Sequence, residues 1–220
     1  MPSDEPPGSR TALDHHRLEE ELLQAAQPAV RVTIVRAPAL SIGIGVPEGA
    51  DYVVRAREIG LPIVRRTTGG TGILHAPGDL LWSVVLPRGD PRIGPDLASA
   101  YARLGAGVVD WLAAHAIRSA WIPAPGLSAS CCPLGPRGRA LTIDDRVLSG
   151  AAQHLTSRGF LHHGSLPRRI DRAQHAEVFG LRDPEETGRL LGTSDLGIDE
   201  PPAAIAGAVQ RAIERRIGLG

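Results

Sequence analysis

The chain has 220 residues, of which 42% are hydrophobic and 22% charged, so it is long enough for a globular domain with one sizeable core. Its formal net charge is zero, which predicts no general attraction to nucleic acid or to anionic lipid. No apolar run approaches the roughly 20 residues of a membrane span, and no secretory signal pattern opens the sequence, so a cytoplasmic protein is expected. We expect residues 1–10 to form a disordered leader and residues 11–220 to form a single domain.

The first part of the chain alternates helical and extended patterns. The expected elements are a helix over 11–26, a strand over 30–37, a glycine-containing turn over 39–50 and a short helix over 51–60. Leucines recur at helical spacing in the first helix, and apolar and polar residues alternate in the strand until Pro38. Gly60 supplies the end of the second helix.

The rest of the chain mixes hairpins with helices. The expected elements are a strand, glycine loop, strand, Pro-Gly turn and strand over 62–87, a long helix over 96–117, a strand, loop and hairpin over 119–155, a strand over 159–167, and helices within 173–181 and 202–217. This order predicts an α+β domain with a mixed, largely antiparallel sheet flanked by helices.

Two features of the composition limit the possible chemistry. All 24 basic residues are arginine, so no mechanism that requires a lysine is available, and a guanidinium cannot act as a base near neutral pH. The two cysteines, Cys131 and Cys132, are adjacent, which is unfavourable for a disulfide between them and incomplete as a zinc site. Free thiols on a surface loop are expected. Such a thiol near arginines is either a nucleophile of lowered pKa or one of an inert pair.

The stretch at 64–75 combines charge with bare backbone. Gly69 and Gly70 let a ligand approach the main chain and permit positive φ. Arg65 and Arg66 are neighbours on a strand, so one side chain is expected to point inward and the other outward. An inward arginine needs an anionic partner, for which a bound phosphate or carboxylate and a structural ion pair are the alternatives. The spacing matches neither a dinucleotide fingerprint nor a Walker loop.

Other candidate residues are weaker one by one. His75, at the end of the glycine loop, is either a hydrogen-bonded structural residue or a catalyst, and Trp82 is expected in the core. Small residues and glycines elsewhere would let a substrate chain lie against the backbone. Ser149 and Gly150 on one strand and Gly164 on another are such residues, and Gln153 and His163 are further candidates on the same two strands. No metal site is expected from His162 and His163, because adjacent side chains on a strand point to opposite faces.

Taken together, five motifs in chain order resemble the lipoate-protein ligase and octanoyltransferase family, which shares its catalytic fold with biotin protein ligases. The stretches that carry the resemblance are "ALDHHRLEEELL" (12–23), "PALSIG" (38–43), "RRTTGGTGILH" (65–75), "RVLSGAAQ" (146–153) and "LHHGSL" (161–166). The resemblance implies a catalytic domain like that of biotin ligases and class II aminoacyl-tRNA synthetases. It also implies a tunnel for an octanoyl or lipoyl chain between the glycine loop and the Ser-Gly strand.

The resemblance further implies where catalysis takes place. One octanoyltransferase branch carries a nucleophilic cysteine on the loop before the Ser-Gly motif, which corresponds to Cys132, with Cys131 as the alternate. The ligases usually carry three consecutive glycines, and here the third position is Thr71. Both branches place a lysine where this chain has Val147, and Arg146 just ahead of it is the candidate substitute only if the strand bulges or shifts.

The function implied by this likeness is transfer of an octanoyl or lipoyl group through a cysteine thioester to a lysine of a lipoyl domain. His75 or solvent would take the proton. The expected partners are acyl carrier protein and the lipoyl domain of a 2-oxoacid dehydrogenase or of the glycine cleavage H protein, and no cofactor is expected. Two alternatives remain open. One is an ATP-dependent lipoate-protein ligase, which alone would use ATP and Mg²⁺, and the other is a noncatalytic member that binds lipoyl domains or acyl chains.

Overall fold

A computed structural model describes residues 8–135 and 138–219 of the chain. Its main sheet has seven strands in the order β1-β2-β6-β10-β9-β8-β7. The strands are β1 Ser9–Arg10, β2 Ala29–Val35, β6 Leu80–Pro87, β7 Ala120–Pro123, β8 Arg139–Ile143, β9 Arg146–Leu155 and β10 Gly159–Leu166. Neighbouring strands are antiparallel except for β1 and β2, which are parallel. The prediction of a mixed, largely antiparallel sheet is confirmed.

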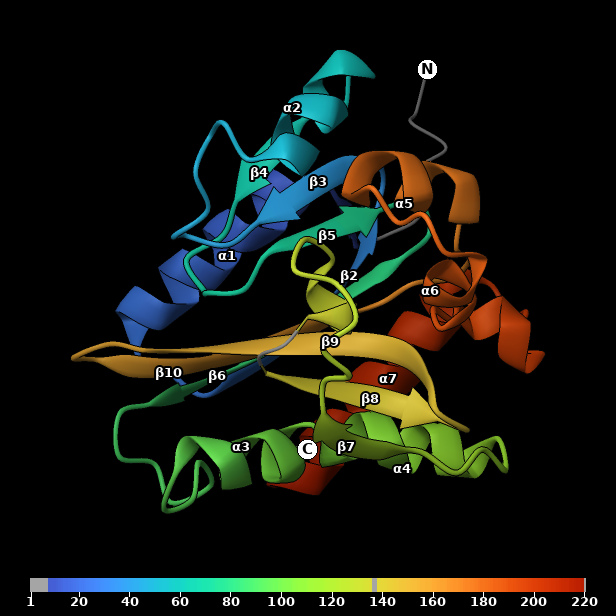
Figure 1. Cartoon of the computed structure of the whole chain (residues 1–220). Coiled ribbons are helices and arrows are strands. Elements are labelled where there is room, and N and C mark those ends of the chain that lie inside the picture. Colours follow the sequence, from blue (N-terminus) through green and yellow to red (C-terminus); the bar gives the residue numbers. More distant parts are fainter. Residues whose placement is uncertain (1–7, 136–137, 220) are drawn as a thin grey trace, which may run out of the picture.

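A smaller sheet lies over one face of the large one (Figure 1). Its order is β4-β3-β5, with β3 (Ala39–Ile42) parallel to β4 (Ile63–Arg65) and antiparallel to β5 (Gly72–His75). The sequence predicts a turn where β3 lies. All four residues of β3 are buried, and its position between two partner strands stabilises it as a strand.

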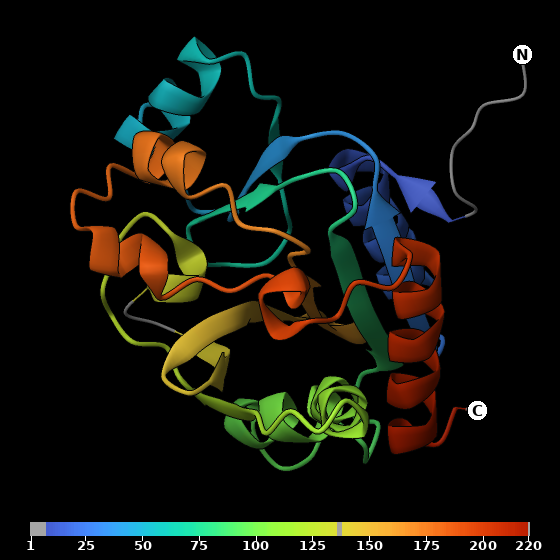
Figure 2. The same cartoon turned by 90° about the vertical axis from the view of Figure 1, so that its right-hand side faces the viewer.

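Helices cover both faces of the main sheet, as Figures 1 and 2 show. They are α1 Ala12–Ala25, α2 Asp51–Glu58, α3 Leu97–Leu104, α4 Ala106–Ala114, α5 Arg172–Phe179, α6 Pro184–Gly188 and α7 Pro202–Ile217. Helices α4 and α7 pack on each other and on the sheet from below, in the view of Figure 1, and α1 packs on β6 and β10 from the other side. Among the described residues, no helix has the length and apolarity needed to cross a bilayer.

Two hydrophobic clusters hold these layers together. The larger lies between the main sheet and α3, α4 and α7, and Trp82, Leu104 and Val209 are fully buried in it. The second lies at the small sheet, where Tyr52 from α2 and Phe179 from α5 pack beside Gly72 of β5. The functional side chains described below lie where the small sheet meets the large one.

Local chemistry accounts for the helix boundaries. Thr11 is the N-cap of α1. Its hydroxyl accepts the Asp14 N–H at 3.1 Å and donates its own proton to the Asp14 carboxylate at 2.7 Å. The single helix predicted over 96–117 is wrong, because it is broken into α3 and α4 at Gly105. There the Trp121 Nε1–H donates to the Gly105 carbonyl at 3.0 Å, and a Cβ on Gly105 would lie 2.5 Å from that nitrogen.

The expected leader also differs at its end. Residues 1–7 lie outside the described residues, but Ser9 and Arg10 form strand β1, paired with Ile34 and Val35. Edge pairing with a buried strand orders these two polar residues, which have no apolar pattern of their own.

Candidate active site

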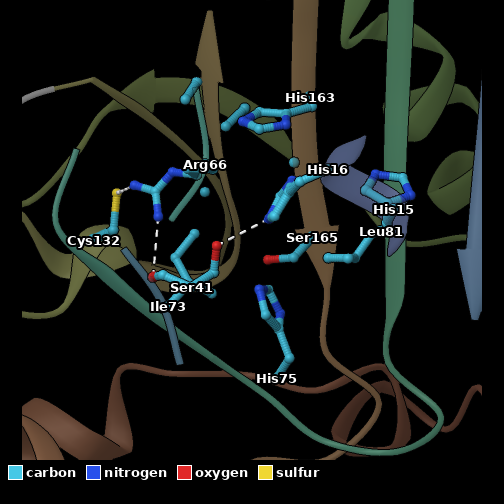
Figure 3. Close-up of a pocket in the computed structure, with 14 residues that line it drawn as sticks. His15, His16, Ser41, Arg66, Ile73, His75, Leu81, Cys132, His163 and Ser165 are labelled. Atoms are coloured by element: carbon cyan, nitrogen blue, oxygen red, sulfur yellow. Dashed lines mark hydrogen bonds between the residues drawn. The ribbon is translucent and has the colours of Figure 1, made fainter. Parts of the chain in front are cut away.

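A small pocket opens where β5 and the loop before β8 face strands β9 and β10 (Figure 3), and its walls leave only about 20 Å³ of free space, so the expected tunnel for an acyl chain is not open here. Its walls come from four parts of the chain that are distant in sequence. They are His15 and His16 of α1; Ser41, Arg66, Ile73 and His75 of the small sheet and its glycine loop; Cys132 of the loop; and Leu81, Gly150, Ala151, Ala152, His163, Gly164 and Ser165 of β6, β9 and β10. Of the predicted site residues, the structure brings Cys132, Arg66, His75, Gly150, His163 and Gly164 together here.

The Cys132 side chain enters the pocket from the loop between β7 and β8. Cys132 begins a 3₁₀ turn, η1 (Cys132–Leu134), and the loop is fixed to β5 because the Gly72 N–H donates to the Ser130 carbonyl at 2.9 Å. The Sγ atom of Cys132 lies 3.9 Å from Nη2 of Arg66. The expected position of this thiol in a loop beside the glycine hairpin agrees with the structure.

Cys131 differs from the expected exposed loop thiol. It is only 1% exposed and packs in the cluster at the small sheet, because its backbone forms a bridge with Gly72 and turns the side chain inward. Burial, with the Cys132 sulfur nearby, raises the pKa of the Cys131 thiol well above its ordinary value. Cys131 is therefore a poor nucleophile, and the two alternates of the sequence interpretation are not equivalent.

Arg66 is the inward arginine of the pair. It is 2% exposed, and its guanidinium donates to Thr68 Oγ1 at 3.1 Å and to the carbonyl oxygens of Ser41, Gly69 and Thr71 at 3.1, 2.8 and 3.0 Å. These bonds close the glycine loop around the guanidinium, a form of pairing that the sequence interpretation did not include. Burial lowers the pKa of Arg66 from its ordinary value, while the nearby Cys132 sulfur acts in the opposite direction. An arginine so placed keeps its charge.

Arg65 is the outward arginine of the pair. Its guanidinium binds the carboxylate of Glu48 and the carbonyl oxygens of Gly43, Ile44 and Val46, so it fixes the turn after β3 rather than facing the pocket. The hydrogen bonds from Arg65 and Arg57 hold the pKa of Glu48 below its ordinary value.

Bare backbone faces the sulfur on two sides. Gly70 has a φ of +91°, and a Cβ there would lie 2.8 Å from Cys132 Sγ. Gly150 on β9 and Gly164 on β10 line the opposite wall, and a Cβ on Gly164 would lie 2.7 Å from the Gly150 carbonyl oxygen. A side chain at Gly70 would therefore collide with the thiol, whereas one at Gly164 would collide with the Trp82 ring, to which a Cβ would be 2.6 Å away.

A buried carboxylate lies behind the pocket wall, and the sequence interpretation missed it. Glu19 of α1 is 1% exposed, and its Oε1 accepts from His163 Nδ1 at 2.8 Å and His15 Nε2 at 3.0 Å. Its Oε2 accepts from His16 Nδ1 at 2.8 Å. Burial alone would raise the pKa of Glu19, but His163 and His15 hold it well below its ordinary value.

Two hydroxyl groups join this carboxylate to the arginine. Nε2 of His163 lies 2.9 Å from Thr68 Oγ1, which also accepts from Arg66. Nε2 of His16 lies 3.0 Å from Ser41 Oγ, and the Ser41 carbonyl accepts from Arg66. Both paths run from Glu19 to the guanidinium beside Cys132. His15 and His16 precede Glu19 by four and three residues, which places all three side chains on neighbouring positions of the helix. This spacing was the available sequence signal for the cluster.

His75 lines the same pocket from the end of β5. Burial holds its pKa well below the ordinary value, with the nearby His16 and Arg66 acting in the same direction, so the ring is neutral. Its Nδ1 is buried and has no hydrogen-bond partner among the described residues. The ring has a free nitrogen, but a pKa so far below the ordinary value makes it a weak proton acceptor near neutral pH.

The predicted residues at the lysine position do not line the pocket. Val147 is buried in the second hydrophobic cluster, and Arg146 is half-buried at the start of β9, opposite Ile143 in the hairpin. The register of the hairpin does shift between Leu141 and Thr142 on β8, yet Arg146 is not among the residues of the pocket wall.

Of the other predicted residues, Gly69 and Thr71 contribute backbone carbonyls to Arg66, and Ser149 turns its hydroxyl back to the Gly150 carbonyl at 3.2 Å. The amide group of Gln153 is buried without a hydrogen-bond partner among the described residues, and Gln153 lies outside the pocket wall. His162 and His163 point to opposite faces as expected, since His162 packs beside Trp82 on the other side of the sheet.

Comparison with known proteins agrees with this geometry. Residues 11–189 match the lipoyl protein ligase A/B catalytic domain. The octanoyltransferase LipM of Bacillus cereus is 26% identical over 186 residues, which cover 79% of this chain and 66% of that protein. The chain thus spans about two thirds of the length of this curated relative.

Two solved structures share the fold. One is a lipoate-protein ligase A bound with ATP, with a TM-score of 0.74 at 20% identity over 92% of this chain and 79% of that chain. The other is a bipartite lipoate protein ligase of Thermoplasma acidophilum, from work on that ligase and its E2 lipoyl domain. It has a TM-score of 0.72 at 20% identity and covers 93% and 78% of the two chains. With its family match over most of its length, the chain belongs to the lipoyl protein ligase A/B catalytic domain family.

Proposed function

We propose that this protein is an acyltransferase that carries an octanoyl or lipoyl group on Cys132 and passes it to a lysine of a lipoyl domain. The position of the Cys132 sulfur supports this function. It lies at the wall of a pocket between the glycine loop and strands β9 and β10, next to a buried cation. The curated relative of Bacillus cereus carries the name octanoyltransferase.

The first step is attack of the Cys132 thiolate on the carbonyl carbon of an acyl thioester. A new C–S bond forms, the bond to the carrier sulfur breaks, and the carrier leaves as a thiol after taking one proton. Arg66 stabilises negative charge on the attacking sulfur because its guanidinium lies beside it. Backbone N–H groups near Gly70 or Gly150 are the proposed donors to the oxyanion.

In the second step the lysine amine of the acceptor attacks the thioester on Cys132. An amide bond forms, the Cys132 sulfur leaves, and the amine loses one proton. Solvent or His75 is the proposed acceptor for that proton; one ring nitrogen of His75 is free of partners, while its lowered pKa makes the ring a weak base. A thioester is converted to an amide, so no ATP is needed on this route. The proposed partners are acyl carrier protein and the lipoyl domain of a 2-oxoacid dehydrogenase or of the glycine cleavage H protein.

The experiment is intact-mass analysis of the purified chain after incubation with octanoyl-acyl carrier protein. The expected result is a gain of one octanoyl group that is absent in Cys132→Ala and present in Cys131→Ala. An unmodified wild-type protein would overturn the proposal. A ligase is distinguished in the same series, because it would attach lipoate to a lipoyl domain with ATP and Mg²⁺ even as the Cys132→Ala variant.

The substitution at the lysine position favours the thiol route over the ligase. Val147 is buried among apolar side chains and Arg146 lies outside the pocket wall, so neither supplies a cation there in place of the lysine. A nucleophile on Cys132 depends less on that cation, because Arg66 already lies next to the sulfur.

A further inference from the structure

We propose that His16, Glu19 and His163 form a binding site for a divalent transition-metal ion, of which Zn²⁺ is the type, in the wall of the pocket. Among the described residues, these three side chains are the His/Cys/Asp/Glu group whose ligand atoms all lie within 4.8 Å of one another. All three are buried. The proposal concerns metal binding itself and does not depend on acyl transfer.

The ligand atoms of the three side chains lie within 4.8 Å of one another, and each histidine nitrogen is closer than this to one carboxylate oxygen. Glu19 Oε2 is 2.8 Å from His16 Nδ1, and Glu19 Oε1 is 2.8 Å from His163 Nδ1. Ligands held at about 2.0–2.1 Å from a zinc ion lie roughly 3 Å from each other. Small side-chain shifts are therefore enough to place an ion between the two rings and the carboxylate.

Both histidines are oriented by hydroxyl groups from elsewhere in the fold. His16 Nε2 lies 3.0 Å from Ser41 Oγ, and His163 Nε2 lies 2.9 Å from Thr68 Oγ1. A histidine that binds metal through Nδ1 carries its proton on Nε2 and donates it to an outer oxygen. The two hydroxyls can accept those protons, so each ring stays neutral and only the position of its proton changes.

Charge also favours a cation here. Glu19 is a buried carboxylate whose direct partners are three imidazoles, and the hydrogen bonds join it to Arg66 only indirectly, through His163 and Thr68 and through His16 and Ser41. A divalent ion would neutralise this carboxylate by direct contact. Two neutral nitrogens and one carboxylate match a common donor set for zinc.

The site has an open side. His16 and His163 both line the pocket, and Figure 3 shows their rings at its wall above Ser165 and His75. Three protein ligands leave at least one coordination position for a water or for an oxygen or sulfur atom of a molecule in the pocket. An open position of this kind distinguishes a reactive or ligand-binding metal from a purely structural one.

The test is binding of Zn²⁺ to the chelator-treated full chain, measured by isothermal titration calorimetry and by metal content after gel filtration. Both cysteines are first replaced in the double variant Cys131→Ser/Cys132→Ser, so that thiolates contribute no ligands. The expected result is one ion per chain, with affinity reduced at least tenfold in Glu19→Gln and in His163→Ala. His115→Ala, on the surface beside Glu200, is the matched control and is expected to bind as before.

Two further measurements separate loss of a ligand from loss of the fold. Circular dichroism must show that each variant is folded, and Thr68→Val must weaken binding without removing a ligand, because it removes the hydroxyl that orients His163. When Co²⁺ is bound to the double serine variant, its visible spectrum is expected to show nitrogen and oxygen ligands. The proposal is overturned if that variant binds no stoichiometric ion, or if folded Glu19→Gln and His163→Ala bind it unchanged. In either case Glu19 is a carboxylate stabilised by hydrogen bonds alone.

Discussion

Cys132 Sγ and Arg66 Nη2 lie 3.9 Å apart, and this contact joins a loop thiol to a guanidinium fixed by the glycine hairpin. The neighbouring Cys131 faces the opposite way, into the cluster at the small sheet. The two adjacent cysteines thus have different environments, and the first prediction follows from this difference.

The two thiols are expected to react at very different rates. Iodoacetamide should label Cys132 first, because its side chain is partly exposed at the pocket beside a cation, whereas Cys131 is buried and its pKa is raised. Peptide mass spectrometry after timed labelling measures both sites in one sample. Equal labelling of the native protein would contradict the placement of Cys131, and unfolding in urea should make the two rates similar.

Replacing Arg66 by methionine is expected to destabilise the fold by about 3 kcal/mol, because it removes the guanidinium that donates to the buried Ser41 carbonyl, to the part-buried Gly69 and Thr71 carbonyls and to the Thr68 hydroxyl. Arg65→Met is the control. Its guanidinium is about one third exposed and pairs at the surface, so a loss of about 1 kcal/mol or less is expected. Urea denaturation measures both values, and losses of equal size would contradict the inward position of Arg66.

Gly43→Ala is expected to distort the glycine loop. A Cβ on Gly43 would lie 2.1 Å from the Gly70 carbonyl oxygen, which is backbone and can move only with the loop itself. The expected cost is about 2–3 kcal/mol in unfolding free energy. Gly45→Ala, where a Cβ meets no atom within 4 Å, is the matched control and should change stability by about 0.5 kcal/mol or less. If Gly45→Ala costs as much as Gly43→Ala, steric contact with Gly70 is not the cause.

Asp79 is expected to make the protein less stable as the pH rises from about 4 to about 7. Burial raises the pKa of its carboxyl from 3.8 to about 7, against the opposing hydrogen bonds from the Ala76 and Arg168 N–H groups. The folded state therefore holds the proton more tightly than the unfolded chain does. This contribution to stability is complete below about pH 4, is lost through the interval and is absent above about pH 7.

The difference corresponds to at most about 4 kcal/mol across that interval. Unfolding free energies measured at a series of pH values for the wild type and for Asp79→Asn isolate this contribution, because other titrating groups are common to both proteins. The variant is expected to lose the downward slope between pH 4 and 7 that the wild type shows. Parallel curves would mean that the Asp79 carboxyl titrates as it does in the unfolded chain.

Local rules of the sequence predicted much of the fold. Alternation along a strand correctly predicted that one of Arg65 and Arg66 points inward and the other outward, and it placed His162 and His163 on opposite faces; which arginine is buried came only from the structure. Most helices and strands were predicted close to their observed positions for the same reason: their signals lie within a few residues. The family match over residues 11–189 confirmed the resemblance that five short motifs indicated.

The features that were missed depend on contacts between distant parts of the chain. Glu19 is an ordinary acidic residue of an amphipathic helix until β10 brings His163, 144 positions away, against it. Likewise Cys131 lies in a segment with no apolar periodicity, and only its bridge to Gly72 buries it. The break at Gly105 required Trp121, which comes from a strand after the helix pair.

The loop that carries Cys132 is attached to both sheets. Its Ser130 carbonyl accepts the Gly72 N–H of the small sheet at 2.9 Å, and Pro133 packs against Gly150 of the large one. The two sheets therefore cannot separate without withdrawing the sulfur from at least one of its neighbours. Hydrogen exchange at the Gly72 amide would report each such opening. The reactivity of the thiol therefore depends on the contact between the two sheets as well as on the neighbouring charge.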